Sequence, residues 1–357
     1  MSALGRVSIL ADHIPWFGRH SGYEQIVPWL EQLHPRVEVT RSRTTYNQIR
    51  LGTAYAILRG WWGRRDFVYS AAELRFALAS RGNHAGVRHV LYAEGHHHFF
   101  EHWRKAPPGV VGTLHHPPQQ WAQWGPRFPR NLARLSSAIA LYSCDLDAFE
   151  RLVGPGRVRF VRHGVDVDFF RPPPTPGAPP AGPPRLLFAG QNGRNTRMLQ
   201  RVVLRLAALH PHLRFDFLVR EEIRAFAGLR DLVGHPRITW YEKLNDEALR
   251  TLYHRATLLL LPFDCCGASN SLLEALACGL PVVTTDVGGV RDYGGGTLYP
   301  VVANDDDDAM LDLVEAYLAD DSLRERVASV GRAFAERELA WPRIARQHLD
   351  AYRALLA

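Results

Sequence analysis

The sequence predicts an α/β protein built from two parallel-sheet units, and three observations lead to this prediction. Short apolar runs alternate with stretches of helical periodicity along most of the chain. The length of 357 residues suits two domains. Between two such series lies Arg171–Pro184 (RPPPTPGAPPAGPP), which is too rich in proline for a helix or a central strand.

The composition favours a globular protein with reduced thiols. The apolar share is 46%, and no stretch approaches about twenty uncharged apolar residues, as a membrane span would need. Asp12 and His13 interrupt the first apolar run, so we expect no secretion signal. The spacing of the four cysteines matches no zinc pattern, which makes a cytoplasmic protein the expectation.

The basic charge lies in the N-terminal half. Residues 1–175 hold 22 Lys and Arg against 13 Asp and Glu, whereas the remainder holds 21 against 23. Such a half favours an anionic partner, for example a membrane surface, a lipid-phosphate acceptor or nucleic acid. A compositional bias towards arginine explains the same charge equally well.

In the N-terminal half, short apolar runs predict strands with helical stretches between them. The predicted strands are Val7–Leu10, Val37–Thr40, Phe67–Tyr69, Val90–Tyr92, Val110–Leu114, Ala138–Ser143 and Val158–Val161. Helices are expected over Tyr23–Leu33 and Leu146–Leu152. No G-x-G-x-x-G follows the first strand, which argues against a nicotinamide dehydrogenase.

Histidines and tryptophans gather in the N-terminal half. Three adjacent histidines in Gly95–Glu101 cannot all face one metal ion, so a polar surface or acceptor loop is favoured. His115 follows a predicted strand, at the sheet edge where ligands bind. Three nearby tryptophans fit a sugar or lipid platform and buried packing equally well. They are Trp103, Trp121 and Trp124.

The C-terminal half repeats the alternation. Its predicted strands are Leu186–Ala189, Phe215–Val219, Ile238–Trp240, Leu258–Pro262 and Val282–Thr285. Helices are expected over Met198–Leu209, from about Asn245, and from Ser269 or Asn270 to Gly279. The acidic run Asp305–Asp308 is expected to cap a helix that starts at Ala309, and two further helices are expected in the C-terminal tail.

Two loops in this half are suited to phosphate. Gly190–Arg197 is a glycine-containing loop with two arginines, and Asp264–Ser269 leads into a helix whose free N–H groups would face an anion. Asn270, Ser271 and Glu274 share one face of that helix, so a phosphate at its start leaves Glu274 within reach of a sugar hydroxyl. The alternative is that Glu274 is a solvated helix acid.

The stretch ASNSLLEALACGLPVVTTDVGG (268–289) resembles the donor-site motif of retaining GT-B glycosyltransferases of family four. That motif carries two glutamates eight positions apart. Glu274 matches the second, which holds the nucleotide ribose in the family. Cys266, before Gly267, stands where the first approaches the transferred sugar. A thiol cannot hold a sugar hydroxyl as a carboxylate does. Either another side chain then binds that hydroxyl, or the preferred sugar lacks it. The alternative is that Cys266 is packed and does not contact the sugar.

Other stretches extend the resemblance over nearly the whole chain. Ser21-Gly22-Tyr23-Glu24 is similar to the family's Gly-Gly-x-Glu loop, and Thr113-Leu114-His115 to a Thr-x-His whose histidine lies beside the sugar. His163-Gly164-Val165-Asp166 is similar to the Asn-Gly-Val-Asp that closes the first domain. Gln191 replaces the family's first diphosphate arginine, and Arg194 or Arg197 matches its second cation.

The resemblance implies a GT-B fold, with two Rossmann-like doubly wound domains facing across a cleft. The implied parts are an acceptor domain over 1–171, a linker over 172–184, a nucleotide-sugar domain over 185–335, and a helix over 336–357 that returns to the first domain. The turn at Tyr241 and Glu242 would read the base.

The implied activity is retaining transfer from a UDP- or GDP-type sugar to a glycan, lipid-linked or small-molecule hydroxyl, without a metal cofactor. Catalytic roles fall to His115, Arg194, Arg197 and Glu274. Donor-binding roles fall to Gly22, Gly190, Tyr241, Glu242, Cys266, Gly267, Ser269, Asn270, Ser271, Leu272 and Glu274. The expected partners are the donor, a hydroxyl acceptor that is anionic or lipid-linked, and the inner membrane face, but no nucleic acid. The alternatives are a GT-B sugar-nucleotide epimerase and a non-catalytic nucleotide-sugar-binding protein.

Overall fold

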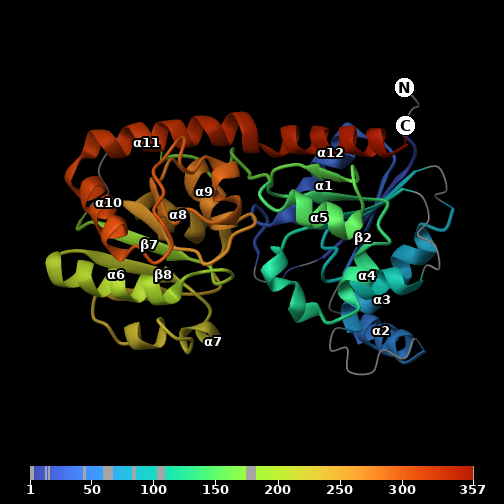
Figure 1. The fold of residues 1–357 in the computed structure, drawn as a ribbon, viewed down its shortest axis with the longest axis horizontal. Coiled ribbons are helices and arrows are strands. Elements are labelled where there is room, and N and C mark those ends of the chain that lie inside the picture. The colour runs from blue at the N-terminus through green and yellow to red at the C-terminus, as the bar shows by residue number, and fades with distance from the viewer. Residues whose placement is uncertain are drawn as a thin grey trace. The chain divides into compact units, whose positions relative to one another are not determined.

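The computed structural model describes residues 4–12, 14, 17–42, 46–58, 67–82, 86–102, 109–173 and 182–356, and these residues form two units (Figure 1). The first unit comprises the described parts of Met1–Pro15, Gly22–His163 and Trp341–Ala357. The second unit comprises the described parts of Trp16–Ser21 and Gly164–Ala340.

The first unit is built on a six-stranded parallel sheet in the order β2-β1-β3-β4-β5-β6. The strands are β1 Val7–Ala11, β2 Val37–Arg41, β3 Val87–Val90, β4 Val110–Leu114, β5 Ser137–Ala140 and β6 Val158–Phe160. Side chains of β1, β3 and β4 are buried throughout, as expected for parallel strands covered on both faces.

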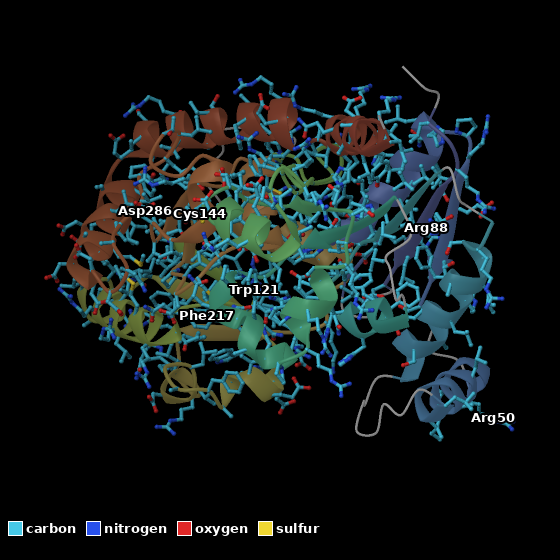
Figure 2. The ribbon with its side chains drawn as sticks, turned by 45° about the vertical axis from the view of Figure 1, so that its right-hand side comes forward. Arg50, Arg88, Trp121, Cys144, Phe217 and Asp286 are labelled. Atoms are coloured by element: carbon cyan, nitrogen blue, oxygen red, sulfur yellow. The ribbon has the colours of Figure 1, made fainter. Side chains whose placement is uncertain are left out.

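Helices cover this first sheet, and Figure 2 locates Arg88 of β3 and Trp121 of η3 among them. They are η1 Tyr23–Gln25, α1 Ile26–Leu33, α2 Tyr46–Leu58, α3 Phe67–Ala79, η2 His97–His102, η3 Pro118–Trp124, α4 Phe128–Leu132, α5 Leu146–Val153 and α12 Trp341–Leu356. The terminal helix α12 is fixed here by polar bonds as well as apolar packing. Its His348 meets the Tyr23 hydroxyl at 2.6 Å, and its Tyr352 meets His89 at 2.6 Å.

Two predicted strands of this unit were placed wrongly. Phe67–Tyr69 begins the helix α3, because the residues that follow (SAAELRFALA) include several good helix formers and extend their conformation over these three residues. The strand predicted at Val90–Tyr92 lies earlier, at Val87–Val90. This strand contains two buried polar residues, Arg88 and His89, so it does not show the apolar run by which strands were predicted. His89 Nε2 forms a hydrogen bond of 2.8 Å with the Thr113 hydroxyl.

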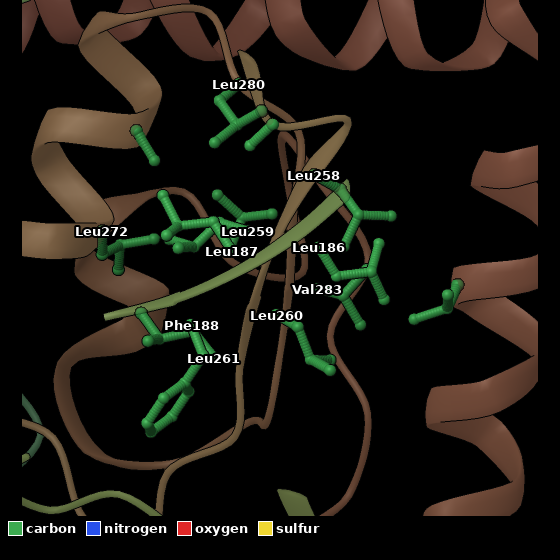
Figure 3. Close-up of a cluster of buried hydrophobic side chains, with 14 of the residues drawn as sticks. Leu186, Leu187, Phe188, Leu258, Leu259, Leu260, Leu261, Leu272, Leu280 and Val283 are labelled. Atoms are coloured by element: carbon green, nitrogen blue, oxygen red, sulfur yellow. The ribbon is translucent and has the colours of Figure 1, made fainter. Parts of the chain in front are cut away.

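The second unit has a five-stranded parallel sheet in the order β11-β10-β7-β8-β9. Its strands are β7 Arg185–Ala189, β8 Arg214–Leu218, β9 Ile238–Tyr241, β10 Leu258–Leu261 and β11 Val282–Thr284. The four leucines of β10 are at most 1% exposed and pack between β7 and β11, as Figure 3 shows for the centre of this core.

Helices of the second unit begin and end largely where the sequence predicts. They are α6 Thr196–Leu209, α7 Glu221–Arg224, η4 Arg230–Leu232, α8 Asp246–Arg255, α9 Asn270–Ala277, η5 Gly288–Tyr293, α10 Asp307–Ala319, α11 Asp321–Phe334 and the π-helical turn η6 Ala335–Leu339. Asn245 caps α8 and Asp306 caps α10, each accepting a backbone N–H. Gly279, with φ of 66°, follows α9 in the left-handed conformation that ends many helices.

The boundary between the units falls before the proline-rich segment. Val165 and Phe170 belong to the core of the second unit, so the chain changes unit between His163 and Gly164. Within the expected linker, residues 174–181 lie outside the described ones. None of the helices in the described parts is both long and apolar enough to cross a bilayer.

Candidate functional site

The candidate site of the second unit lies at the carboxyl edge of its sheet, where loops after β7, β8 and β10 come together. The loop after β10 is joined to the loop after β7, because the Asp264 N–H donates to the Gly193 carbonyl at 2.9 Å. On its other side, the Gly289 N–H donates to the Cys266 carbonyl at 2.7 Å. These bonds fix the backbone that leads into α9.

Two glycines make this close approach sterically possible. A Cβ on Gly193 would lie 2.1 Å from the Cys265 carbonyl oxygen, and a Cβ on Gly288 would lie 2.0 Å from that of Cys266. Both glycines also have positive φ, 66° and 53°, which other residues adopt at a cost. Any side chain at either position would push the loop out of place.

No side chain caps the N-terminus of α9. Ser269 occupies the capping position, but its hydroxyl makes no capping bond to the helix. By contrast, helices α6, α8, α10 and α11 of the same unit are capped by Asn195, Asn245, Asp306 and Asp320. The first amides of α9, with the positive end of its dipole, therefore remain suited to an anion.

Arg194 lies beside this open helix end. Its Nη2 donates to the hydroxyls of Ser269 and Ser271, at 3.2 Å each, and to the Ala189 carbonyl at 2.9 Å. The guanidinium also stacks over the Phe263 ring, 4.3 Å from its centroid. Burial lowers the pKa of Arg194 to about 10, which still leaves it charged at neutral pH.

The hydrogen-bond partners of Arg194 are uncharged. Among the described residues, no carboxylate pairs with it; its polar partners are carbonyl and hydroxyl oxygens. Gly190 provides the space, since a Cβ there would lie 2.6 Å from Nη2. A partly buried cation next to an uncapped helix end is a strong anion-binding arrangement.

Arg197, the other arginine expected here, serves a different neighbourhood. It is exposed on the first turn of α6, near Asp305. The pKa of Asp305 is lowered by its hydrogen bonds from Arg201 and Asn195, and the charge of Arg197 contributes. Of the two arginines that the sequence predicts as diphosphate ligands, only Arg194 therefore lies beside the start of α9.

Arg220 is a cation that sequence reasoning missed. It follows β8 and donates from Nε to the side-chain oxygen of Gln191 at 3.0 Å. The resemblance implies a cation at Gln191, and this hydrogen bond brings a guanidinium close to Gln191 from the end of the neighbouring strand. The signal in the sequence was an arginine directly after a buried strand.

Glu274 lies on the second turn of α9 and is 5% exposed. Its Oε1 accepts from the Ser21 hydroxyl and its Oε2 from the Tyr253 hydroxyl, each at 2.7 Å. Burial raises the pKa of Glu274, and the two hydrogen bonds counteract part of that rise. The interpretation of Glu274 as a solvated helix acid is wrong, because the carboxyl is buried and bonded.

Cys266 and Gly267 are buried, and Cys266 belongs to the core of the second unit at 4% exposure. The Cys266 thiol points to the Gly267 carbonyl at 3.6 Å. The nearby Cys266 thiol counteracts part of the lowering that burial causes in the pKa of Arg194. Cys266 is therefore both packed in the core and close to Arg194.

The turn after β9 uses its side chains for local bonds. Arg255 stacks over the Tyr241 ring at 5.1 Å and donates to its hydroxyl. Glu242 accepts the Glu221 N–H at 3.0 Å, and this bond lowers the pKa of Glu242. Lys243 has a φ of 50°, so the backbone turns sharply here.

In the first unit, His115 follows β4 and is held as a neutral imidazole. Burial lowers the pKa of His115 to about 3. Its Nε2 donates to the Leu91 carbonyl at 2.7 Å, which leaves Nδ1 as an acceptor. The ring stacks on Tyr92 at 4.5 Å, and the backbone N–H donates to Glu94 at 2.5 Å.

Other described residues of this unit that the sequence singled out make local hydrogen bonds or pack against neighbouring rings. Gly22, with φ of 96°, stands at the start of η1. Trp121 donates to the His116 carbonyl at 3.2 Å, and Trp124 stacks on Phe128 at 5.1 Å. Trp103 lies outside the described residues.

The histidine cluster contains an ion-pair network. His96 is 0% exposed and bridges Asp12 and Glu73, with 2.8 Å from Nε2 and from Nδ1 respectively. Burial opposes the charged imidazole, but the charges and hydrogen bonds of these carboxylates prevail and raise the pKa of His96 to about 10. Within the described residues, no group of His, Cys, Asp and Glu has an arrangement that would hold a metal ion.

Comparison with known proteins connects this site to a family. Residues 183–320 match the family model described as "Glycosyl transferases group 1". The chain is 30% identical over 237 residues to the D-inositol 3-phosphate glycosyltransferase of Xylanimonas cellulosilytica, covering 60% of this chain and 53% of that protein. It is 31% identical over 232 residues to the alpha-maltose-1-phosphate synthase of Mycobacterium tuberculosis, covering 57% and 58%. The chain thus spans about half the length of the curated relatives it matches.

Solved structures share the fold at low identity. The sucrose-phosphate synthase of Thermosynechococcus elongatus superposes with a TM-score of 0.72 at 17% identity, covering 98% of this chain and 99% of that one. Anabaena HepE, solved with UDP-glucose, superposes with a TM-score of 0.70 at 14% identity, covering 97% and 99%. The expected GT-B class of fold is confirmed, with a doubly wound sheet in each unit.

Proposed function

We propose that this chain, whose residues 183–320 match the family model of glycosyl transferases group 1, transfers a sugar from a nucleotide diphosphate sugar to an acceptor hydroxyl. The observation that carries the proposal is Arg194, a partly buried cation without a carboxylate partner among the described residues, set beside the uncapped start of α9. A nucleotide diphosphate supplies the anion that such a place requires.

The reaction needs negative charge to develop on the leaving diphosphate. Arg194 and the first amides of α9 stabilise that charge in our proposal, and Arg220 contributes from the Gln191 side. These protein charges take the place of a divalent ion. Front-face attack by the acceptor retains the anomeric configuration, and a diphosphate oxygen takes the acceptor proton.

The remaining roles follow from hydrogen-bonding capacity. Glu274 would accept from the ribose, since each of its oxygens keeps a further lone pair beyond the Ser21 and Tyr253 bonds. His115 would accept a sugar hydroxyl at Nδ1, because Nε2 is occupied by Leu91. In the turn at Tyr241 and Glu242, backbone groups would read a uracil or guanine base.

We further propose that the acceptor is anionic or lipid-linked and that the protein works in the cytoplasm at the inner membrane face. The support is in α2, where four apolar side chains are exposed: Ile49 39%, Leu51 42%, Ile57 50% and Leu58 83%. Arg50 extends from the same helix (Figure 2). Residues 41–81 contain eight arginines against two acidic residues, which account for most of the net charge of +7. In the described part of this stretch Arg41, Arg50, Arg75 and Arg81 are exposed. Exposed apolar and basic side chains together fit anionic lipid.

The experiment is a panel of UDP- and GDP-sugars with glycan and lipid acceptors, following release of nucleoside diphosphate and formation of product. Acceptor-dependent release with an α-linked product from an α-linked donor supports retaining transfer. Interconversion of the donor without release supports an epimerase, and binding without turnover supports a non-catalytic protein.

A further inference from the structure

We propose that Tyr253 and Ser21 are positioning residues, which hold the Glu274 carboxylate so that its remaining lone pairs receive the two ribose hydroxyls of the nucleotide. The inference rests on the proposed function. It adds two residues from distant parts of the chain, and it makes the site selective for a ribonucleotide over a 2′-deoxynucleotide.

The two hydrogen bonds to Glu274 are divided evenly between its oxygens. Ser21 donates to Oε1 and Tyr253 to Oε2, each at 2.7 Å. A carboxylate has about four acceptor positions, so one position on each oxygen is still available. Two hydroxyl donors on opposite oxygens also fix the plane of the carboxylate, which a single bond would not.

The partners of Glu274 carry no positive charge. Both donors are neutral hydroxyls, and among the described residues no Lys, Arg or His forms an ion pair with Glu274. The charged group that affects its pKa is another acid, Asp246, which raises it. A buried carboxylate without a counter-ion gains from each further hydrogen-bond donor that reaches it, and a vicinal diol brings two.

Both donors are fixed by the rest of the second unit. Tyr253 lies on α8 and is 2% exposed. Its ring packs edge-to-face against Phe170, with 6.1 Å between the ring centroids. Ser21 ends a short loop that two other bonds fix to the same unit. The Arg19 N–H donates to Asp246 at 2.8 Å, and His20 meets Asp166 at 2.6 Å. The donors are therefore already in place before a ligand arrives.

Burial raises the pKa of Glu274 and the two hydroxyls counteract that rise, so loss of either hydroxyl raises the pKa further. The carboxyl of a variant would then take up a proton at a higher pH than in the wild type. A protonated carboxyl is a weaker acceptor, so ribonucleotide affinity should be lost earlier as the pH falls. A purely structural hydroxyl would produce no such displacement.

The test measures the dissociation constants of UDP, GDP and their 2′-deoxy analogues between pH 5 and 9. The variants are Tyr253→Phe and Ser21→Ala. Tyr317→Phe is the matched control, because Tyr317 is a buried tyrosine of the same unit whose hydroxyl has no hydrogen-bond partner in the described structure. Ser21→Ala keeps the test valid if Tyr253→Phe folds poorly.

We expect the wild type to prefer the ribonucleotide, and Tyr253→Phe to weaken ribonucleotide binding about tenfold while leaving the 2′-deoxy analogue nearly unchanged. The midpoint of the pH profile should move upwards in that variant and stay in place in Tyr317→Phe. Equal weakening of both nucleotides, or an unmoved midpoint, overturns the inference. A wild type that binds neither UDP nor GDP overturns the proposed function as well.

Discussion

The guanidinium of Arg220 donates a hydrogen bond of 3.0 Å to the side-chain oxygen of Gln191, across the neighbouring strands β8 and β7. An amide cannot stabilise a diphosphate as a cation does, but this amide orients a cation that comes from the next strand. In our proposal, Arg220 therefore supplies the positive charge that Gln191 lacks.

The arginines should therefore differ in their effect on turnover. Arg194→Ala should lower kcat about a hundredfold, as expected for a charge contact that strengthens in the transition state. Arg220→Ala should lower it about tenfold. Arg197→Ala is the matched control on the exposed start of α6 and should be nearly neutral. A silent Arg194→Ala would remove Arg194 from the diphosphate site.

Cys266→Glu should change the preference among donors. The new carboxylate would lie near Arg194, in a place that is 4% exposed, and would reward a donor whose sugar offers a matching hydroxyl. Initial rates with several sugar nucleotides measure the effect, and Cys278→Ser, another buried cysteine, serves as the control. Unchanged rate ratios in a folded variant would show that Cys266 lies away from the sugar.

Activity should persist in excess chelator. In our proposal the positive charge at the leaving group comes from Arg194 and the α9 amides, so EDTA should change the initial rate by less than about twofold. The assay is release of nucleoside diphosphate before and after exhaustive chelation. Loss of activity that Mg²⁺ or Mn²⁺ restores would contradict the proposal of protein charges alone.

The stability of the protein should fall in alkali because of His96. Its pKa in the folded state is about 10, above the ordinary value of 6.5, so its contribution is complete below pH 6.5 and is lost as the pH rises through 10. Urea unfolding at several pH values measures this loss.

His96→Gln should lower the free energy of unfolding by about 3–5 kcal/mol at neutral pH, since Asp12 and Glu73 lose their buried counter-ion. It should also flatten the alkaline decline. The control is His210→Gln, where the histidine is 38% exposed and meets Glu315 at 3.4 Å. An identical alkaline decline in both variants would mean that another group titrates.

Membrane attachment should depend on the exposed end of α2. Replacing Ile57 and Leu58 together with Asp should reduce co-sedimentation with phosphatidylglycerol-containing vesicles at least about tenfold, because two apolar contacts are lost and two negative charges are added. Leu209→Asp is the control, since Leu209 is 59% exposed on α6 of the other unit. Equal binding by both variants would place the attachment elsewhere or exclude it.

The sequence was most informative where a short local pattern decides the structure. The β10 leucines, the cap at Asn245 and the stop at Gly279 each depend on neighbours within a few positions, and all three were predicted correctly. Phe67–Tyr69 failed because its local preference for a strand is weaker than that of the helical sequence behind it.

The partners of the site residues were beyond sequence reasoning for a different reason. Tyr253 and Ser21 are 21 and 253 positions from Glu274, and Arg220 is 29 positions from Gln191. Such pairs meet only through the order of strands and the packing of helices on them. Arg194 and Arg197 were likewise expected in one loop, but Arg194 lies before the cap of α6 and Arg197 on the first turn of that helix.

The glycines at 193 and 288 have a consequence for how this site can evolve. They hold the carbonyls of Cys265 and Cys266 from both sides, so the path of the loop is determined by its backbone and not by its side chains. In our proposal, a substitution at position 266 that the core tolerates changes donor preference while the first amides of α9 keep their places. Replacement of either glycine would instead displace the loop and the start of α9 together.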